Sequence, residues 1–390
     1  MLKGKSRQEA RGKRQKLICF INNYPLPITH YPLPKEDKLM SKLVKVLIVD
    51  DSAYVRKVVR QMLSRSPFIE VVGTARDGKE ALELVEKLDP DVVTLDLIMP
   101  CLDGVEFLRE QMARRPLPVV VVSIASEAGE MALAALDAGA VDFVQKPTAL
   151  ATEKVFEIAD ELTEKVKAAA KVPMGQLPVK PGVLSPQAKP TAPIDLQPPK
   201  GLLSMVAIGI STGGPQALAT LIPQLPANFP VPIAIVLHMP VGYTKMYAER
   251  LDQLSELKVV QAEEGDVLRP GIVLIAPGGR HLTFKRQASG KVVAHLDARP
   301  FDTLHRPSVD VMFQSAAEIY GDRLLGVVMT GMGSDGKQGA SWIKSQGGSI
   351  FTEAESSCIV YGMPRAVVES NLSDRSVSLE FMARAILDVI

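Results

Sequence analysis

Short apolar runs alternate with amphipathic segments along the first part of the chain. From residue 44 to about residue 166, runs of four or five apolar residues are separated by stretches whose apolar positions recur at helical spacing. The apolar runs contain almost no polar residues, as expected of parallel strands that helices cover on both faces. The predicted strands are Val46–Val49, Val71–Thr74, Val92–Leu95, Val119–Val122 and Val141–Val144, with helical stretches such as Ala53–Leu63, Gly78–Leu88 and Met131–Ala138 between them.

A second alternating pattern runs from Leu203 to the C-terminus, so this half of the chain is also predicted to be an α/β sheet domain. Within it, the segment Leu282–Leu296 alternates apolar and polar residues, which predicts an antiparallel hairpin. The predicted strands are Met205–Gly209, Ile233–Leu237, Val273–Ala276, Leu325–Met329 and Gly348–Phe351, and the predicted helices are Gln216–Leu225, Tyr243–Leu254, Val309–Tyr320 and Gly339–Ser345.

Two further segments lack this periodicity. Residues 171–200 contain eight prolines, so we interpret 167–202 as an extended linker between domains at 44–166 and 203–390. Residues 1–40 carry seven Lys or Arg among the first sixteen positions and a repeated Tyr-Pro-Leu-Pro unit. Such a segment cannot form a core, and we expect a disordered or mis-called extension, with Met40 as an alternative start. A basic arm that binds a membrane or nucleic acid is the alternative.

Composition narrows the function classes. The 390 residues have a net charge of +1, which gives no electrostatic reason to expect nucleic acid as a partner. The three cysteines are widely separated, so neither a disulfide framework nor a zinc site is predicted, and a cytoplasmic location follows as the default. No apolar run approaches the roughly 20 residues of a membrane-spanning helix, so we do not expect an integral membrane protein.

Polar residues of matching chemistry follow successive strands of the first domain. Asp50 and Asp51 follow the first strand, and Asp96 follows the third. These carboxylates meet at the carboxyl edge of a parallel sheet, where α/β proteins bind ligands, and they repel one another unless a cation lies between them. Mg²⁺ suits such oxygen ligands. Ser123 and Lys146 end the fourth and fifth strands and offer a hydroxyl and a positive charge to a phosphoryl group.

This first domain resembles the receiver domain of bacterial response regulators. The matching residues are the acidic pair, the segment Leu95-Asp96-Leu97-Ile98-Met99-Pro100, Asp103-Gly104, Ser123, and Asp142-Phe143-x-x-Lys146-Pro147. The resemblance implies a flavodoxin-like fold and phosphorylation of Asp96 by a histidine kinase. It also implies Mg²⁺ on the carboxylates of Asp50, Asp51 and Asp96 and the carbonyl of Ile98, with Ser123, Phe143 and Lys146 as the switch residues.

Three residues of the second domain have the chemistry of a hydrolase. Ser211 lies in a Gly-x-Ser-x-Gly turn between a strand and a helix, as in a nucleophile elbow. His238 follows the next strand, and Asp335 follows a later one. These residue types fit a nucleophile, a general base and an orienting carboxylate. Their order along the chain differs from that of the α/β hydrolases, which argues against that fold.

A dinucleotide-binding turn is the main alternative for the same region. Gly331-x-Gly333-x-x-Gly336 follows a strand, and Glu353 or Glu355 lies where a ribose-binding acid would. However, Asp335 would place a negative charge in a turn meant for a pyrophosphate, and Ser211 and His238 would have no role.

The second domain resembles the catalytic domain of the chemotaxis protein-glutamate methylesterases. With the receiver and linker, the resemblance covers about nine tenths of the chain. The matching stretches are Ile208-Gly-Ile-Ser-Thr-Gly-Gly-Pro215, Val236-Leu-His-Met-Pro240, Tyr243 through Leu251, Ala276-Pro-Gly278, Arg306-Pro-Ser-Val-Asp-Val311 and Met329-Thr-Gly-Met-Gly-Ser-Asp-Gly336.

This resemblance implies hydrolysis of glutamate methyl esters on chemoreceptors, with deamidation of receptor glutamines as a second activity. It assigns Ser211 as nucleophile, His238 as general base, Asp335 as orienting acid and the Met332 N–H as oxyanion donor, with no cofactor in this domain. Ser334 stands where the family commonly has asparagine. The family also implies that the unphosphorylated receiver covers the catalytic cleft and that a chemotaxis histidine kinase supplies the phosphoryl group.

Other function classes fit less well. A transcriptional response regulator would need a basic reading helix, which residues 203–390 lack. A catalytically dead scaffold or a nucleotide sensor would keep the fold without the three catalytic residue types. The remaining histidines, His281, His295 and His305, lack ligand spacing and are interpreted as surface or packing residues. The resemblance also allows His305-Arg306 to line the substrate cleft.

Overall fold

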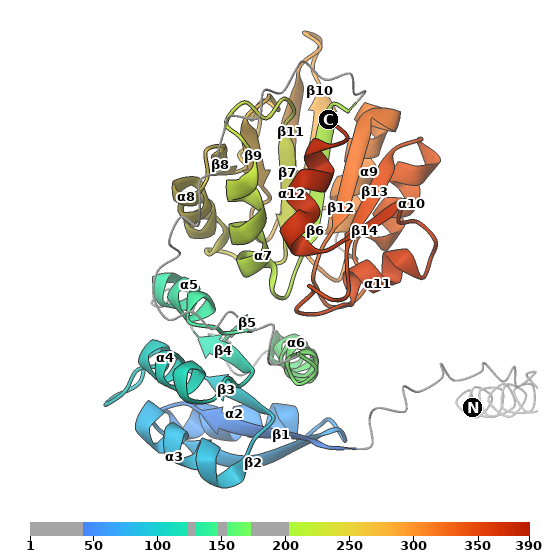
Figure 1. Cartoon of the computed structure of the whole chain (residues 1–390). Coiled ribbons are helices and arrows are strands. Elements are labelled where there is room, and N and C mark those ends of the chain that lie inside the picture. Colours follow the sequence, from blue (N-terminus) through green and yellow to red (C-terminus); the bar gives the residue numbers. More distant parts are fainter. Residues whose placement is uncertain (1–41, 124–128, 147–153, 173–202, 301) are drawn as a thin grey trace, which may run out of the picture. The chain divides into compact units, whose positions relative to one another are not determined.

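The structure is a computed structural model, which describes residues 42–123, 129–146, 154–172, 203–300 and 302–390 (Figure 1). The predicted extension at 1–40 and residues 173–202 of the predicted linker lie outside the described residues.

The first domain is built on a five-stranded parallel sheet with the strand order β2-β1-β3-β4-β5. The predicted α/β class and all five predicted strands are confirmed. The chain order reverses between β1 and β3, and α/β proteins typically bind ligands at the carboxyl ends of the strands at such a point. The strands are β1 (Val44–Val49), β2 (Ile69–Ala75), β3 (Val92–Leu95), β4 (Val119–Ser123) and β5 (Asp142–Gln145).

Three helices of this domain, which begin at Ala53, Gly78 and Gly104, each follow a side chain that accepts hydrogen bonds from the first turn. Asp103, for example, accepts hydrogen bonds of 2.9 Å from the backbone N–H groups of Val105 and Glu106 and so satisfies two donors that have no partner within the helix. The helices are α2 (Ala53–Leu63), α3 (Gly78–Leu88), α4 (Gly104–Arg114), α5 (Gly129–Asp137) and α6 (Lys154–Ala169).

The second domain is built on a seven-stranded parallel sheet with the order β14-β13-β12-β6-β7-β9-β8. Five of these strands match predicted ones, whereas β8 and β14 were not predicted. Both lie at an edge of the sheet, and neither is a continuous apolar run. The strands are β6 (Met205–Ile210), β7 (Ile233–Leu237), β8 (Lys258–Gln261), β9 (Ile272–Ile275), β12 (Leu324–Val328), β13 (Ser349–Glu353) and β14 (Arg375–Val377).

Helices cover both faces of this sheet, as the doubly wound prediction requires. Along β6, Val206 and Ile208 belong to one hydrophobic cluster, which includes side chains of α7, α8 and α12. The alternate residues Met205 and Ala207 belong to a second cluster, on the side of α9 and α10. The helices are α7 (Gly214–Leu221), α8 (Thr244–Leu254), α9 (Val309–Tyr320), α10 (Lys337–Ser345), α11 (Met363–Val368) and α12 (Leu379–Leu387), with short 3₁₀ turns at Ile222–Gln224 and Gly321–Arg323.

The predicted hairpin is confirmed. Strands β10 (His281–Arg286) and β11 (Val292–Asp297) pair antiparallel, with Phe284 opposite Ala294. Leu282, Phe284, Val292 and Ala294 are buried in the same cluster as α9, so one face of the hairpin packs on the domain.

Gly209 lets α9 approach the central strand β6. A methyl group built at this glycine would lie 2.2 Å from the Cγ1 of Val309, the first residue of α9. We therefore predict that Gly209→Ala lowers the free energy of unfolding by about 1–3 kcal/mol, as overpacking usually does. Chemical denaturation measures this, and Gly209→Ala/Val309→Ala should recover part of the loss because the colliding methyl groups are removed. Equal midpoints for the wild type and both variants would contradict the close approach.

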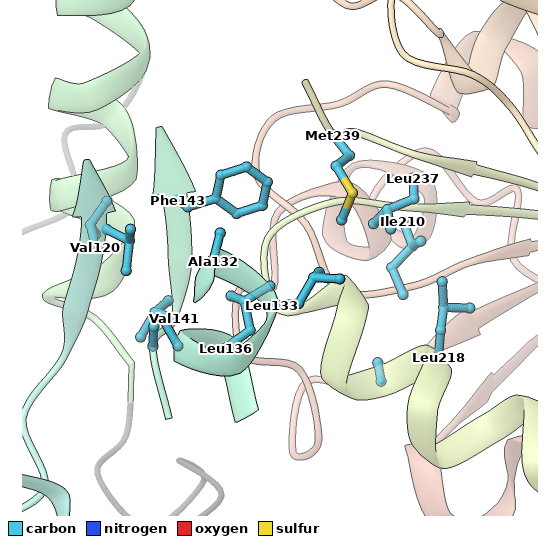
Figure 2. Close-up of a cluster of buried hydrophobic side chains, with 14 of the residues drawn as sticks. Val120, Ala132, Leu133, Leu136, Val141, Phe143, Ile210, Leu218, Leu237 and Met239 are labelled. Carbon is cyan, nitrogen blue, oxygen red and sulfur yellow. The ribbon is translucent and has the colours of Figure 1, made fainter. Parts of the chain in front are cut away.

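One continuous hydrophobic cluster includes residues of both large sheets and their helices. Figure 2 shows part of it, where Leu133, Leu136 and Phe143 from α5 and β5 lie near side chains of the second domain that include Leu237 and Met239. The ring centroid of Phe143 lies 4.8 Å from that of Tyr243, which is fully buried. This contact brings the receiver-like domain next to the strand ends that carry Ser211 and His238.

Candidate active site

The candidate catalytic residues follow three adjacent strands of the seven-stranded sheet. Ser211 follows β6, and His238 follows β7, with Ile210 and Leu237 paired in the register between these strands. The backbone N–H of His238 donates to Ile210 O at 3.1 Å, and the N–H of Ser211 donates to Thr330 O at 3.0 Å. Because β6 lies between β12 and β7, the strand order changes direction here, and α/β proteins typically bind ligands at the carboxyl ends of the strands at such a point.

The serine stands in a tight turn that glycine makes possible. Gly213 has a φ of +79°, and a Cβ there would lie 2.6 Å from the Cβ of Ile359. Both the positive φ and the close packing exclude larger residues. The N–H of Gly214 closes the turn on Ser211 O at 2.7 Å, and α7 begins at that glycine. This is the strand–turn–helix geometry expected of a nucleophile elbow.

Asp335 accepts a hydrogen bond of 2.8 Å between its Oδ2 and His238 Nε2, and the two side chains are only 9% and 8% exposed. Its carboxylate also accepts from Ser308 Oγ at 2.9 Å and from the N–H groups of Val309 and Asp310 at 2.8 and 2.9 Å. Burial alone would raise the pKa of Asp335, but the hydrogen bond and charge of His238 and these backbone donors outweigh it. The pKa is held well below its usual value, so the carboxylate is ionised at neutral pH.

The hydrogen bond to Asp335 determines which nitrogen of His238 carries the proton. An ionised carboxylate only accepts, so Nε2 is the protonated nitrogen and Nδ1 keeps its lone pair. Nδ1 is buried and has no hydrogen-bond partner among the described residues. An imidazole with a free lone pair beside the strand end of Ser211 is chemically able to accept a proton. Catalytic hydrogen bonds to a nucleophile often form only when substrate is bound.

Asp310 is a half-buried acid at this site to which we assigned no role from the sequence. Its Oδ1 accepts from the N–H groups of Gly336 and Gly339 at 2.9 and 2.7 Å and so fixes the turn that carries Asp335. Burial and the charge of Asp335 raise the pKa of Asp310 to about 6. The only sequence signal was its place in the Arg306–Val311 stretch of the family resemblance.

Two of the three remaining histidines are the packing or surface residues that the sequence predicted. His281 is fully buried, where its Nδ1 accepts from Ser308 N at 3.2 Å and its Nε2 donates to Pro300 O at 3.1 Å. His295 pairs with Glu264 at 2.9 Å on the hairpin. His305 differs, because its ring stacks on His238 with centroids 4.1 Å apart.

The dinucleotide alternative loses one of its two candidate ribose-binding acids. Glu353 is fully buried, and it accepts hydrogen bonds from Thr330 N at 2.9 Å and Ser357 Oγ at 3.0 Å. Its carboxylate is therefore not open to a ribose. Asp335, in the same glycine-rich segment, is directed at His238 instead.

The structure brings the acidic residues of the first domain together. One carboxylate oxygen from each of Asp50, Asp51 and Asp96 lies within 4.8 Å of the others. Lys146 Nζ lies 2.6 Å from Asp50 Oδ2 and 2.7 Å from Asp96 Oδ2. Burial raises the pKa of Asp50 above its usual value even though Lys146 binds it, so further positive charge would be favourable here. This donor set of carboxylates can bind a divalent metal ion.

The other predicted residues of this domain lie in different surroundings. Ser123 ends β4, and its buried hydroxyl has no partner among the described residues. The side chain of Ile98 is 43% exposed and follows the acidic residue Asp96 by two positions. Phe143 is buried, and its ring contacts that of Tyr243 in the second domain.

A buried hydrogen bond joins the receiver-like domain to the serine turn. Thr212, the residue after Ser211, donates from Oγ1 to Asp142 Oδ2. Asp142 also pairs with Lys165 at 3.2 Å. Burial alone would lower the pKa of Lys165, but the charges of Asp142 and Glu161 outweigh it and raise the pKa, so the lysine is charged. Near this pair, Gln216 Nε2 donates to Ala140 O at 2.9 Å, and Arg250 pairs with Asp137.

Family models match both domains. Residues 46–155 match the response regulator receiver domain, and residues 206–386 match the CheB methylesterase. No helix among the described residues is long and apolar enough to cross a membrane.

Curated relatives match nearly the whole chain. Protein-glutamate methylesterase/protein-glutamine glutaminase 5 of Myxococcus xanthus is 51% identical over 87% of this chain and 96% of its own length. Protein-glutamate methylesterase/protein-glutamine glutaminase 2 of Methanosarcina mazei is 42% identical over 90% of this chain and 98% of its own length. The protein-glutamate methylesterase/protein-glutamine glutaminase of Halalkalibacterium halodurans is 43% identical over 89% of this chain and 99% of its own length. With identities this high over nearly full length, the chain belongs to the family of the protein-glutamate methylesterases/protein-glutamine glutaminases, in which a receiver domain precedes a CheB methylesterase domain.

Proposed function

We propose that this protein hydrolyses glutamate γ-methyl esters on chemoreceptors, and deamidates receptor glutamines, under the control of phosphorylation at Asp96. The observation that carries the catalytic part is the 2.8 Å hydrogen bond between His238 and a buried, ionised Asp335 at the strand end next to Ser211. The names of the relatives supply the substrate class. We assign residues 44–166 to the receiver, 167–202 to a linker and 203–390 to the catalytic domain.

In the proposed reaction, Ser211 Oγ attacks the ester carbonyl while His238 Nδ1 takes the hydroxyl proton. Asp335 keeps Nε2 protonated and stabilises the imidazolium that forms. The tetrahedral oxyanion is bound by the backbone N–H of Met332, in the loop between β12 and Asp335. Collapse of this intermediate breaks the ester C–O bond, and the His238 proton leaves with methanol.

Water then repeats the same steps on the acyl-enzyme. His238 takes a proton from water as the hydroxide attacks the acyl carbon. The bond between this carbon and Ser211 Oγ then breaks, and His238 returns the proton to Oγ as the glutamate side chain is released. With a glutamine substrate, ammonia takes the place of methanol as the leaving group, so the same residues serve for deamidation.

Asp96 is the proposed phosphoacceptor, with a chemotaxis histidine kinase in the cytoplasm as the phosphodonor. The carboxylates of Asp50, Asp51 and Asp96 and the carbonyl of Ile98 would hold Mg²⁺, which neutralises charge during phosphoryl transfer when bound. Lys146 pairs with Asp50 and Asp96, and it is the proposed ligand of a phosphoryl oxygen. The Ser123 hydroxyl and the Phe143 ring are the proposed switch that reports phosphorylation to the domain surface.

Methanol release from methylated receptor membranes tests this function, with and without a small phosphodonor and Mg²⁺. The wild type should be activated by the phosphodonor, whereas Asp96→Asn should keep a low basal rate that the phosphodonor does not raise, because the amide cannot accept the phosphoryl group. Asp91→Asn is the matched control. Asp91 precedes β3 instead of following it, and its Oδ2 accepts a hydrogen bond from Lys45 N. Equal activation of the wild type and Asp96→Asn would refute Asp96 as the phosphoacceptor, and the absence of methanol from the wild type would refute the esterase.

A further inference from the structure

The ring of His305 stacks on the ring of His238. The two centroids are 4.1 Å apart, and the ring planes differ by 23°. His305 precedes α9 by four positions and comes from a different part of the chain than the strand that carries His238. This stack contacts the proposed base on its face, whereas Asp335 contacts it at its edge.

A single hydrogen bond does not fix the plane of an imidazole ring. His238 is bound through Nε2 to Asp335, and its Nδ1 has no partner among the described residues. The ring could therefore turn about the Nε2–oxygen direction, and such a turn would change the direction in which Nδ1 points. A flat group stacked on the ring face opposes this rotation, since tilting the imidazole would bring it into collision with that group.

The segment that carries His305 is anchored to the same carboxylate as His238. Gly279 N donates to Arg306 O at 2.9 Å, and Ser308 N donates to the fully buried His281 at 3.2 Å. Ser308 Oγ in turn donates to Asp335 Oδ1 at 2.9 Å. The stack and the edge hydrogen bond therefore belong to one connected framework, so both hold His238 in the same orientation.

Burial and the nearby charges keep the ring of His305 neutral. Burial lowers the pKa of His305 to about 4, and the charges of His238 and Lys165 add to this while Asp335 opposes it. At neutral pH the stack therefore consists of one uncharged imidazole and the proposed base. A neutral aromatic face attracts a cation, so it favours the imidazolium that His238 becomes during the reaction. A second cation at this position would repel it.

We propose that His305 is a positioning residue, which fixes the ring plane of His238 by stacking and so keeps Nδ1 directed at Ser211. This inference rests on the proposed esterase function. It assigns His305 no proton transfer and no contact with the substrate, and it requires only the flat ring.

The test compares His305→Ala with His305→Phe in the full-length protein, with methanol release as the assay. His305→Ala should lower kcat about tenfold and leave KM within about twofold, since a misdirected base slows the chemistry without weakening binding. His305→Phe restores a flat, uncharged ring and should recover most of kcat. His295→Ala is the control, because His295 pairs with Glu264 on the hairpin, and it should match the wild type.

Melting temperatures of all variants separate loss of folding from loss of orientation. If His305→Ala folds poorly, His305→Gln, which keeps the polarity but not the ring, replaces it in the comparison with His305→Phe. Phenylalanine as slow as alanine would overturn the stacking role, and so would a raised KM with unchanged kcat or full activity of His305→Ala. An inactive wild type would instead refute the proposed function itself, so the two failures are distinguishable.

Discussion

Ser211→Ala should abolish methanol release while the protein stays folded. Alanine fits the turn between β6 and α7 because it is smaller than serine and leaves the backbone hydrogen bonds of Ser211 N and O in place. Without the hydroxyl no acyl-enzyme can form, and loss of such a nucleophile typically costs about 10⁶-fold in kcat. Methanol release and thermal unfolding, measured on the same preparation, check the two halves of this prediction.

Ser289→Ala is the matched control for Ser211→Ala, since this exposed serine lies in the turn between β10 and β11. It should leave both the rate and the melting temperature unchanged. Substantial turnover by a well-folded Ser211→Ala protein would rule out the serine mechanism. A thermal shift of that variant with NAD would favour the dinucleotide alternative instead.

The sheets and their strand-end residues could be predicted because they depend on local patterns. Both sheets consist mainly of continuous apolar strands, and polar residues directly after such strands must lie at the carboxyl edge of a parallel sheet. Asp50, Asp96, Ser211 and His238 all follow from this rule. The strands β8 and β14 do not, because edge strands are partly exposed and their sequences, Lys258–Gln261 and Arg375–Val377, have no apolar run.

The residues that hold the catalytic side chains in position could not be predicted in this way. Asp335 is held by Ser308, Val309 and Asp310, which lie 25 to 27 positions earlier in the chain. Neither composition nor periodicity predicts which loop will contact the end of which helix across a sheet. The same limit explains why His305 was interpreted as a surface or packing residue, when its packing partner is the proposed base itself.

The contact between the domains was expected only from the family resemblance, and its residues could not be read from the sequence. Asp142 was part of a receiver motif, and Thr212 was simply the residue after the serine. Their hydrogen bond places a receiver carboxylate one residue from the proposed nucleophile. Met239, one residue from the proposed base, lies in the buried cluster to which Phe143 also belongs. The receiver therefore contacts the residue next to the proposed nucleophile and shares a buried cluster with the residue next to the proposed base.

Removing residues 1–200 should raise the basal esterase rate above that of the unphosphorylated full-length protein. Without the receiver, Thr212 loses its contact with Asp142, and Tyr243 loses the ring of Phe143, so the receptor segment can reach the serine turn. A typical coupling free energy of about 1–3 kcal/mol between two sites corresponds to a change of about 5- to 150-fold, and we expect activation in this range. The truncated protein should also ignore the phosphodonor.

A charge exchange tests the same contact within the full-length chain. Asp137 on α5 pairs with Arg250 on α8, so Asp137→Arg places two like charges together and should raise the unphosphorylated rate, although less than the deletion, because this ion pair is partly exposed. Asp137→Arg/Arg250→Asp restores an opposite-charge pair and should return the rate toward that of the wild type. Deletion of residues 1–39 alone controls for the truncation and should change neither the rate nor the melting temperature. A stable 201–390 fragment that is slower than the unphosphorylated whole would exclude simple inhibition, and the receiver would then have to assist catalysis or deliver the substrate.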